Sequence, residues 1–385
     1  MGKVLIVATA GAGGDLQPLV AAALALAGRG HAIHVMGDGS VKRSLQALDL
    51  EMDELPSELD LGPALIGAIR EAMASTGGDM AAAGPLVRER LTEWAGRVAV
   101  PVGQAVRGYE PDLVVTSLFG VEVLDMASSA CPWAVINSTF YIGPNAPRPM
   151  EQDFAGRAVA LLSHYRSLLG SADLVLHATD RAFDFGFDGL PPGHHYAGPL
   201  GIWEPPTEPA AYLDEPGDPW VLVAISSQMQ DDVPLAQAAL GALAPRPVRV
   251  LVTLGPDHDP SELSAIPPNA RVEKVVSHSA VLERGSLLVS HAGHGSVMKA
   301  LWHGRPMVLV PWGRDQPGVA ARAAALGIAR VVPREEASPE RLGSAIDEAL
   351  DDETMRERAR QHSRRLRMTD PPAAAASILE TVLRA

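Results

Sequence analysis

The residues with the clearest chemical potential are a histidine, two glycines and a serine that follow an apolar run. The run covers residues 287–290, and His291, Gly293, Gly295 and Ser296 come directly after it. If a helix begins there, the glycines let the backbone approach a ligand, and the free N–H groups and the helix dipole favour a phosphate. His291 adds a further donor. A tight turn with two solvent-facing histidines fits this segment equally well.

A second polar pair follows the next apolar run, residues 307–310. Asp315 and Gln316 stand there, in front of Pro317. Ligands of open α/β sheets bind beyond the carboxyl ends of the strands. A carboxylate beside an amide can accept from and donate to sugar hydroxyls. The structural alternative for Asp315 is a helix N-cap.

A third candidate lies near the amino end. Residues 4–9 are apolar and lead into a glycine-rich loop with Gly14 and Asp15, and Pro18 is well placed in a first helical turn. A phosphate-binding loop is one interpretation. A dinucleotide site is disfavoured, because Leu16 stands where a small residue is needed and Asp15 would repel a pyrophosphate. Asp15 fits a general base or a helix cap, and the two roles are compatible.

The elements that must position these residues show a βαβ rhythm. Short runs rich in β-branched residues alternate with Ala/Leu-rich stretches of helical period, which predicts two Rossmann-like α/β domains built on parallel sheets. The predicted strands lie at residues 4–9, 32–36, 113–115, 134–136, 220–225, 248–253, 287–290, 307–310 and 330–332. We predict an acceptor-binding domain over 1–200, a proline-rich acidic linker over 201–219, a donor-binding domain over 220–370 and a closing helix over 371–385.

Composition sets the limits. The 385 residues carry a net charge of −14, 47% are hydrophobic and 4% are aromatic, and no basic run offers a site for nucleic acid or an anionic membrane. The single cysteine, Cys131, excludes an intrachain disulfide, and we expect it to pack in a helix-to-strand connection. No apolar run approaches the roughly 18 residues of a membrane span. We expect a cytoplasmic protein, without stable membrane insertion, of undetermined oligomeric state.

The polar segments resemble the donor-binding signature of family 1 glycosyltransferases of the two-domain GT-B type. That pattern runs close to His-x-Gly-x-Gly-Ser/Thr, then Gly-x-Pro, then Asp-Gln-Pro. The matching positions here are His291, Gly293, Gly295, Ser296, Gly304, Pro306, Asp315, Gln316 and Pro317. The resemblance implies that His291, Gly295 and Ser296 hold the diphosphate of a nucleotide-sugar donor. It also implies that Asp315 and Gln316 contact the transferred sugar.

The chain departs from the family pattern where a Trp-x-Pro-Gln segment usually cradles the nucleobase. Val275 stands for the stacking tryptophan and His278 for the glutamine. The resemblance then implies that backbone groups of Val276 and apolar contacts hold the base, and it leaves UDP and TDP donors both open. Ser227, after the predicted strand 220–225, resembles the Ser/Thr-rich turn beside the phosphate and sugar, and a simple turn fits it equally well.

The acceptor side resembles the Gly-Asp-x-x-Pro motif of sterol and glycopeptide-antibiotic glycosyltransferases, here Gly14, Asp15 and Pro18. The resemblance implies that Asp15 is the general base of an inverting transfer to a hydroxyl of a small lipophilic natural product. Ser117 stands where His-type relatives place an orienting carboxylate. Phe119 joins Gly14 on the acceptor side, although core packing explains it as well.

Other readings stay open beside this one. The Asp257-His-Asp259 sequence has the Asp-x-Asp form of metal-dependent glycosyltransferases, but it lies in a proline-containing loop, and we predict no metal site and no cofactor. His194 and His195 lack further ligands nearby, so we expect surface or linker packing. A noncatalytic nucleotide-sugar binder or partner subunit, and a nucleotide-sugar epimerase, are the alternative functions.

Overall fold

The computed structural model describes residues 1–9, 14–127, 131–141, 168–184, 189–208, 210–227, 230–256 and 258–383. The chain folds into two compact units. The first comprises Met1–Pro205 together with Asp370–Ala385, and the second comprises Pro206–Thr369. The segment over 201–219 is therefore shared between the units rather than standing apart from both.

The first unit is built on a parallel sheet with strand order β3-β2-β1-β4-β5-β6-β7. The runs predicted in this half are strands, and β3, β6 and β7 are additional. The central strands are apolar on both faces because helices cover both sides of a parallel sheet. The strands are β1 (Lys3–Ala8), β2 (Ala32–Gly37), β3 (Glu51–Glu54), β4 (Leu113–Ser117), β5 (Trp133–Asn137), β6 (Leu174–His177) and β7 (His194–Tyr196).

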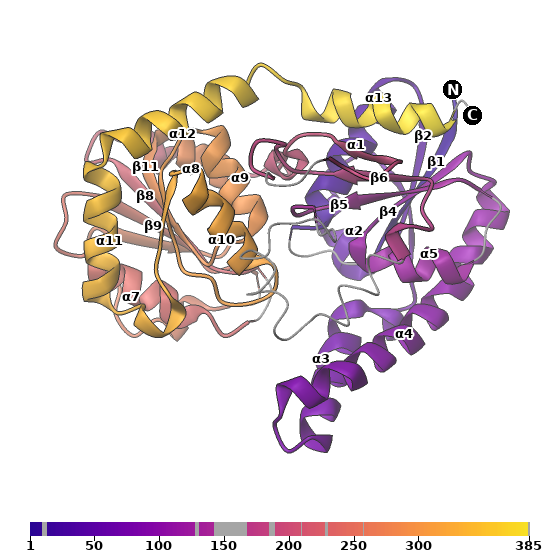
Figure 1. Cartoon of the computed structure of the whole chain (residues 1–385), viewed down its shortest axis with the longest axis horizontal. Helices are drawn as coiled ribbons and strands as arrows, with labels where there is room; N and C mark the ends of the chain where they lie inside the picture. The colour runs from indigo at the N-terminus through magenta and orange to yellow at the C-terminus, as the bar shows by residue number, and fades with distance from the viewer. Residues whose placement is uncertain are drawn as a thin grey trace. The chain divides into compact units, whose positions relative to one another are not determined.

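The helices of the first unit include a long pair that the sequence did not predict. They are α1 (Leu16–Gly28), α2 (Gly39–Leu45), α3 (Leu61–Ser75), α4 (Met80–Tyr109), α5 (Val121–Ala127) and α13 (Pro371–Leu383). In Figure 1 the ends of α3 and α4 that are joined to each other project away from the sheet. At the sheet end of the pair, Trp94 of α4 is buried and its indole N–H donates to the carbonyl of Leu59 over 2.7 Å.

The last helix, α13, packs on the first, α1, as Figure 1 shows. Ala375, Ala376 and Leu379 are fully buried in the same core as Leu26 of α1. Polar contacts secure the edge of this packing. Glu380 receives Arg29 Nη1 at 3.2 Å on one carboxylate oxygen and lies 3.1 Å from His31 Nε2 on the other.

The second unit repeats the architecture with a parallel sheet of order β10-β9-β8-β11-β12-β13. Its strands are β8 (Trp220–Ala224), β9 (Arg249–Thr253), β10 (Ala270–Glu273), β11 (Gly285–Ser290), β12 (Met307–Leu309) and β13 (Ala329–Val331). Its helices are α7 (Val233–Leu243), α8 (His278–Arg284), α9 (His294–Trp302), α10 (Gln316–Ala325), α11 (Pro339–Asp351) and α12 (Glu353–Leu366). The predicted α/β class with two Rossmann-like halves is confirmed.

Each sheet changes direction at its centre, and the candidate residues follow the strands at that point. Strand β1 lies between β2 and β4, and strand β8 lies between β9 and β11. Asp15 follows β1, and His291 follows β11. Ligands of open α/β sheets bind at such switch points, beyond the carboxyl ends of the strands.

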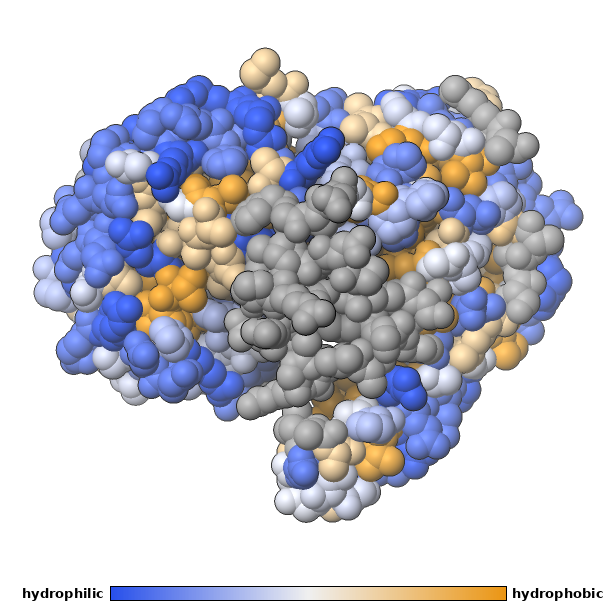
Figure 2. Space-filling view, viewed as in Figure 1, coloured by the Kyte–Doolittle hydropathy of each residue, from blue (hydrophilic) through white to orange (hydrophobic). Residues whose placement is uncertain are grey.

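The surface is mainly hydrophilic over α11 and α12, in the upper left of Figure 2. In the part of the chain that the structure describes, no helix is both long and apolar enough to cross a membrane.

Candidate functional site

The best-defined candidate site lies where β11 meets α9. His291 is buried directly after the strand, Ala292 takes a left-handed conformation with φ 69°, and Gly293 is the N-cap of α9. The N–H groups in the first turn of a helix have no acceptors within the helix. The turn presents these N–H groups at the end of the strand, and Gly295 and Ser296 are half-buried within it.

His291 has a defined orientation. Its Nδ1 lies 3.2 Å from the carbonyl oxygen of Ala224, at the end of β8. A carbonyl oxygen only accepts hydrogen bonds, so Nδ1 carries the hydrogen. In the neutral ring Nε2 then holds a lone pair.

Gly293 is required by its closeness to this ring. A Cβ on Gly293 would lie 2.5 Å from His291 Nε2, well inside contact distance. The Gly293 backbone angles, φ −61° and ψ 131°, are open to any residue. The glycine therefore serves close approach rather than unusual backbone geometry, and it places His291 Nε2 at the N-terminal end of α9.

Behind His291 lies a buried carboxylate that the sequence analysis did not identify. Asp232, just before α7, is fully buried, and its Oδ2 lies 3.9 Å from His291 Nδ1. The same oxygen accepts from the backbone N–H of Ser226 at 2.8 Å and from the Gln230 amide at 2.9 Å. Nothing in the spacing of the acidic residues distinguishes Asp232 from its exposed neighbours. Burial of His291 lowers its pKa, and the Asp232 carboxylate acts in the opposite direction.

Gln316 joins this network. Its Oε1 accepts from the backbone N–H groups of Trp312 at 2.8 Å and Gly313 at 3.0 Å, and its Nε2 donates to Gln230 Oε1 at 2.9 Å. The side chain thus holds the loop before α10, with its amide oxygen already engaged by backbone. Asp315 occupies the N-cap position of α10 but makes no capping bond through its side chain. Sugar contact by both residues stays a prediction.

The residues proposed around the base and the phosphate lie on neighbouring loops of the same unit. Ser227 is half-buried after β8, and a Cβ on Gly255, whose φ is +84°, would approach the Ser227 Cα to 3.0 Å. Val276 is half-buried before α8. His278 begins that helix, with its Nε2 2.9 Å from Thr253 Oγ1. Their roles toward a base stay predictions.

In the first unit, Asp15 contacts a residue that the sequence analysis missed. Its Oδ1 accepts a hydrogen bond from the hydroxyl of Ser138, the residue after β5. Ser117 ends β4 and is buried, and Phe119 packs partly buried against the core beside α4. Gly14 is exposed, and the glycines before it lie outside the described residues. No motif marks Ser138, because it follows an ordinary apolar strand.

The paired histidines of the sequence belong to an edge strand rather than to a linker. His194 begins β7, and its Nδ1 lies 3.0 Å from Nε2 of the fully buried His177. Burial, with a smaller contribution from the neighbouring histidines, lowers the pKa of His177 to about 3. Cys131 is half-buried before β5, as predicted, and burial raises the pKa of its thiol to about 11.

The Asp-x-Asp sequence is only partly covered, since Asp257 lies outside the described residues. Asp259 caps a short helical turn by accepting from Ser261 N at 3.0 Å, and its carboxylate pairs with Lys274 at 3.7 Å. Its carboxylate therefore already has a structural role.

Comparisons with known proteins agree with this architecture. Residues 237–382 match the family described as "Erythromycin biosynthesis protein CIII-like, C-terminal domain". The 4'-demethylrebeccamycin synthase of Lentzea aerocolonigenes is 31% identical over 221 residues, which are 57% of this chain and half of that protein's length. The O-mycaminosyltylonolide 6-deoxyallosyltransferase of Streptomyces fradiae is 26% identical over 400 residues, covering 92% of this chain and 91% of that protein.

A solved structure extends the match to the whole fold. CalG4, the calicheamicin glycosyltransferase, superposes with a TM-score of 0.76 at 21% identity, covering 100% of this chain and 98% of that one. The resemblance to glycosyltransferases of the GT-B type is confirmed at the level of fold. The chain thus has the two-unit GT-B glycosyltransferase fold and carries, over residues 237–382, a C-terminal domain of the erythromycin CIII type.

Proposed function

We propose that the chain is an inverting, metal-independent glycosyltransferase. It moves a sugar from a UDP- or TDP-sugar to a hydroxyl group of a small lipophilic natural product. The observation that carries this proposal is the start of α9 at the switch point of the second sheet, where His291 and Gly293 build an anion-binding turn. A spinosyn rhamnosyltransferase of the same fold, solved with thymidine diphosphate, supports a diphosphate ligand.

In this proposal Asp15 accepts the proton of the acceptor hydroxyl. The hydroxyl oxygen forms a bond to the anomeric carbon as the bond from that carbon to the diphosphate oxygen breaks. The diphosphate leaves from the opposite face with the electron pair, so the configuration inverts. Negative charge grows on the leaving group in the transition state, and the α9 turn stabilises it most at that moment.

The experiment combines the protein with UDP- and TDP-sugars and a panel of lipophilic alcohols and phenols, and follows glycosylated product by mass. We expect product, and we expect Asp15→Asn to lower kcat by about 10²- to 10⁴-fold. TDP affinity should remain, because Asp15 belongs to the first unit and the α9 turn to the second. Nucleotide binding without product would favour a noncatalytic binder, and a changed sugar without acceptor would favour an epimerase. Absence of nucleotide binding would contradict the proposal.

Ser138 holds the base in this scheme, since its hydroxyl donates to Asp15 Oδ1. A base whose position is fixed reacts faster without binding substrate more tightly. Ser138→Ala should lower kcat about tenfold with little change in KM, and Ser138→Thr, which keeps a hydroxyl, should restore most of it. Ser171→Ala, which removes an exposed hydroxyl elsewhere in this unit, is the control. Equal losses in KM and kcat would argue for general damage to the loop.

A further inference from the structure

The inference concerns the proton inventory of the donor site, and it rests on the proposed function. His291 Nδ1 donates to a backbone carbonyl, which leaves a lone pair on Nε2 of the neutral ring. Nε2 stands beside Gly293 at the N-terminal end of α9. The oxygens of an ionised diphosphate accept hydrogen bonds and do not donate them. A neutral His291 in this orientation would therefore present a lone pair to an acceptor.

Donor binding at this turn consequently calls for a second proton on the ring. A buried imidazolium needs a counter-charge, because desolvation disfavours it. Asp232 supplies one: it is fully buried and its Oδ2 lies 3.9 Å from His291 Nδ1. Among the described residues, the second oxygen of Asp232 has no hydrogen-bond partner, so this carboxylate is not fully neutralised by its surroundings.

Two further charged groups face His291, both from the loop before α10. Asp315 favours the imidazolium and Arg314 opposes it, and burial keeps the pKa of the ring low while no anion is bound. The balance of these effects is a neutral ring at neutral pH in the unliganded protein. A diphosphate arriving at Nε2 adds negative charge on the opposite side of the ring from Asp232.

We propose that nucleotide binding is linked to proton uptake: His291 takes one proton from solvent as the diphosphate binds, and Asp232 balances the resulting imidazolium. Asp232 is thus a positioning residue that acts on the ligand through His291. Gln230 extends this arrangement, since its amide joins Asp232 Oδ2 to Gln316 and so connects the phosphate side of the site to the loop before α10.

The test is titration calorimetry of the intact chain with thymidine diphosphate, in two buffers of different ionisation enthalpy. At about pH 8 the nucleotide is fully ionised and the unperturbed histidine pKa of about 6.5 leaves the free ring neutral, so protons taken up report on the protein. We expect the wild type to take up more than about half a proton per nucleotide bound. Affinity should fall as pH rises, by up to about tenfold per pH unit.

Three variants make the assignment specific. Asp232→Asn removes the counter-charge, so uptake should fall below half of the wild-type value and affinity by about tenfold, the equivalent of one pKa unit. His291→Gln keeps an amide donor that needs no extra proton, so it should bind without uptake. Glu357→Gln, on the exposed face of α12, should match the wild type.

Thermal unfolding verifies that each variant is folded before its titration is interpreted. Binding without proton uptake by the wild type would overturn the inference while leaving the proposed function intact. Uptake that persists in His291→Gln would also overturn it. Failure of both TDP and UDP to bind would overturn the proposed function, and this inference with it.

Discussion

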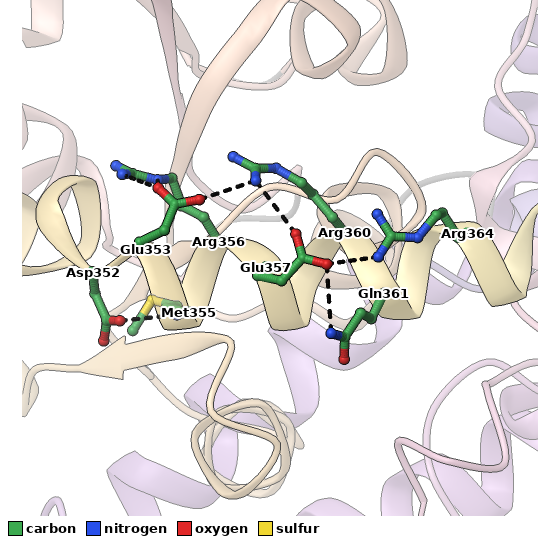
Figure 3. A network of polar contacts seen from close by, with 8 residues as sticks. All are labelled: Asp352, Glu353, Met355, Arg356, Glu357, Arg360, Gln361 and Arg364. Atoms are coloured by element: carbon green, nitrogen blue, oxygen red, sulfur yellow. Dashed lines mark hydrogen bonds and ion pairs between the residues drawn. The ribbon is translucent and has the colours of Figure 1, made fainter.

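Two polar networks of the second unit use similar side chains in opposite surroundings. On α12, Glu353 and Glu357 alternate with Arg356, Arg360 and Arg364, and Figure 3 shows them in a row along the helix. The ion pairs are short, for example 2.6 Å between Arg364 Nη2 and Glu357 Oε1, but the side chains are largely exposed. At the start of α9, Asp232 and His291 stand 3.9 Å apart and are buried.

The difference shows that short distance does not measure consequence. Water and salt screen the α12 pairs, and holding long side chains in place costs conformational entropy. Around Asp232 the polar groups have few alternative partners, so removing one leaves another unsatisfied. The looser buried pair should therefore matter more than the tighter exposed one, for stability as well as for ligand binding.

The sharpest way to break this comparison is to remove one carboxylate from each network. Asp232→Ala leaves the Ser226 N–H and the Gln230 amide without their acceptor, and we expect a loss of about 2 to 3 kcal/mol in the free energy of unfolding. Glu357→Ala should leave the free energy of unfolding within experimental error. Urea unfolding followed by circular dichroism measures both. Similar losses in the two variants would contradict the ranking.

A second prediction extends the comparison to the buried histidine of the first unit. The pKa of His177 is about 3 in the folded chain, whereas an unfolded histidine titrates near 6.5. As pH falls below about 6.5, the unfolded state takes up a proton that the folded state refuses, so stability falls, by about 2 kcal/mol at about pH 5.

Chemical denaturation of wild type and His177→Gln across this range measures that contribution. The variant should lose that part of the pH dependence, whereas His362→Gln, a partly exposed histidine on α12, should keep it. If the two variants have parallel curves, His177 is not the group responsible.

The smallest expected effect concerns glycine. Gly293→Ala would place a Cβ 2.5 Å from His291 Nε2, and we expect it to cost about 1 to 2 kcal/mol through displacement of the ring. Gly313→Ala meets nothing within 4 Å and should be neutral for stability. In a His291→Ala background the cost of Gly293→Ala should disappear. A cost that persists there would mean that the backbone, not the ring, requires the glycine.

The sequence predicted the strands well because apolar β-branched runs on both sheets identify buried parallel strands. It missed α3 and α4, since Gly62, Gly67, Pro85 and Pro101 interrupt the pattern that identifies a helix. In the structure both prolines lie inside α4, and tertiary packing around Trp94 overrides local propensity.

The candidate site was predicted where a motif marks it and missed where only burial does. His291, Gly293 and Asp315 belong to a recognisable spacing. Asp232 and Ser138 do not, because one acidic residue in a polar loop and one serine after a strand have no distinctive pattern. Only the fold reveals that Asp232 is enclosed behind His291 and that Ser138 reaches Asp15.

The return of the chain to the first unit has a consequence for biosynthesis. Residues 206–369 complete the second unit, but the first still lacks α13, whose Leu379 shares a core with Leu26 of α1. Domains fold during synthesis as their residues emerge from the ribosome. The unit that begins first should therefore finish last, and a chain stopped near Thr369 would expose the apolar surface of α1 while its second half is already complete.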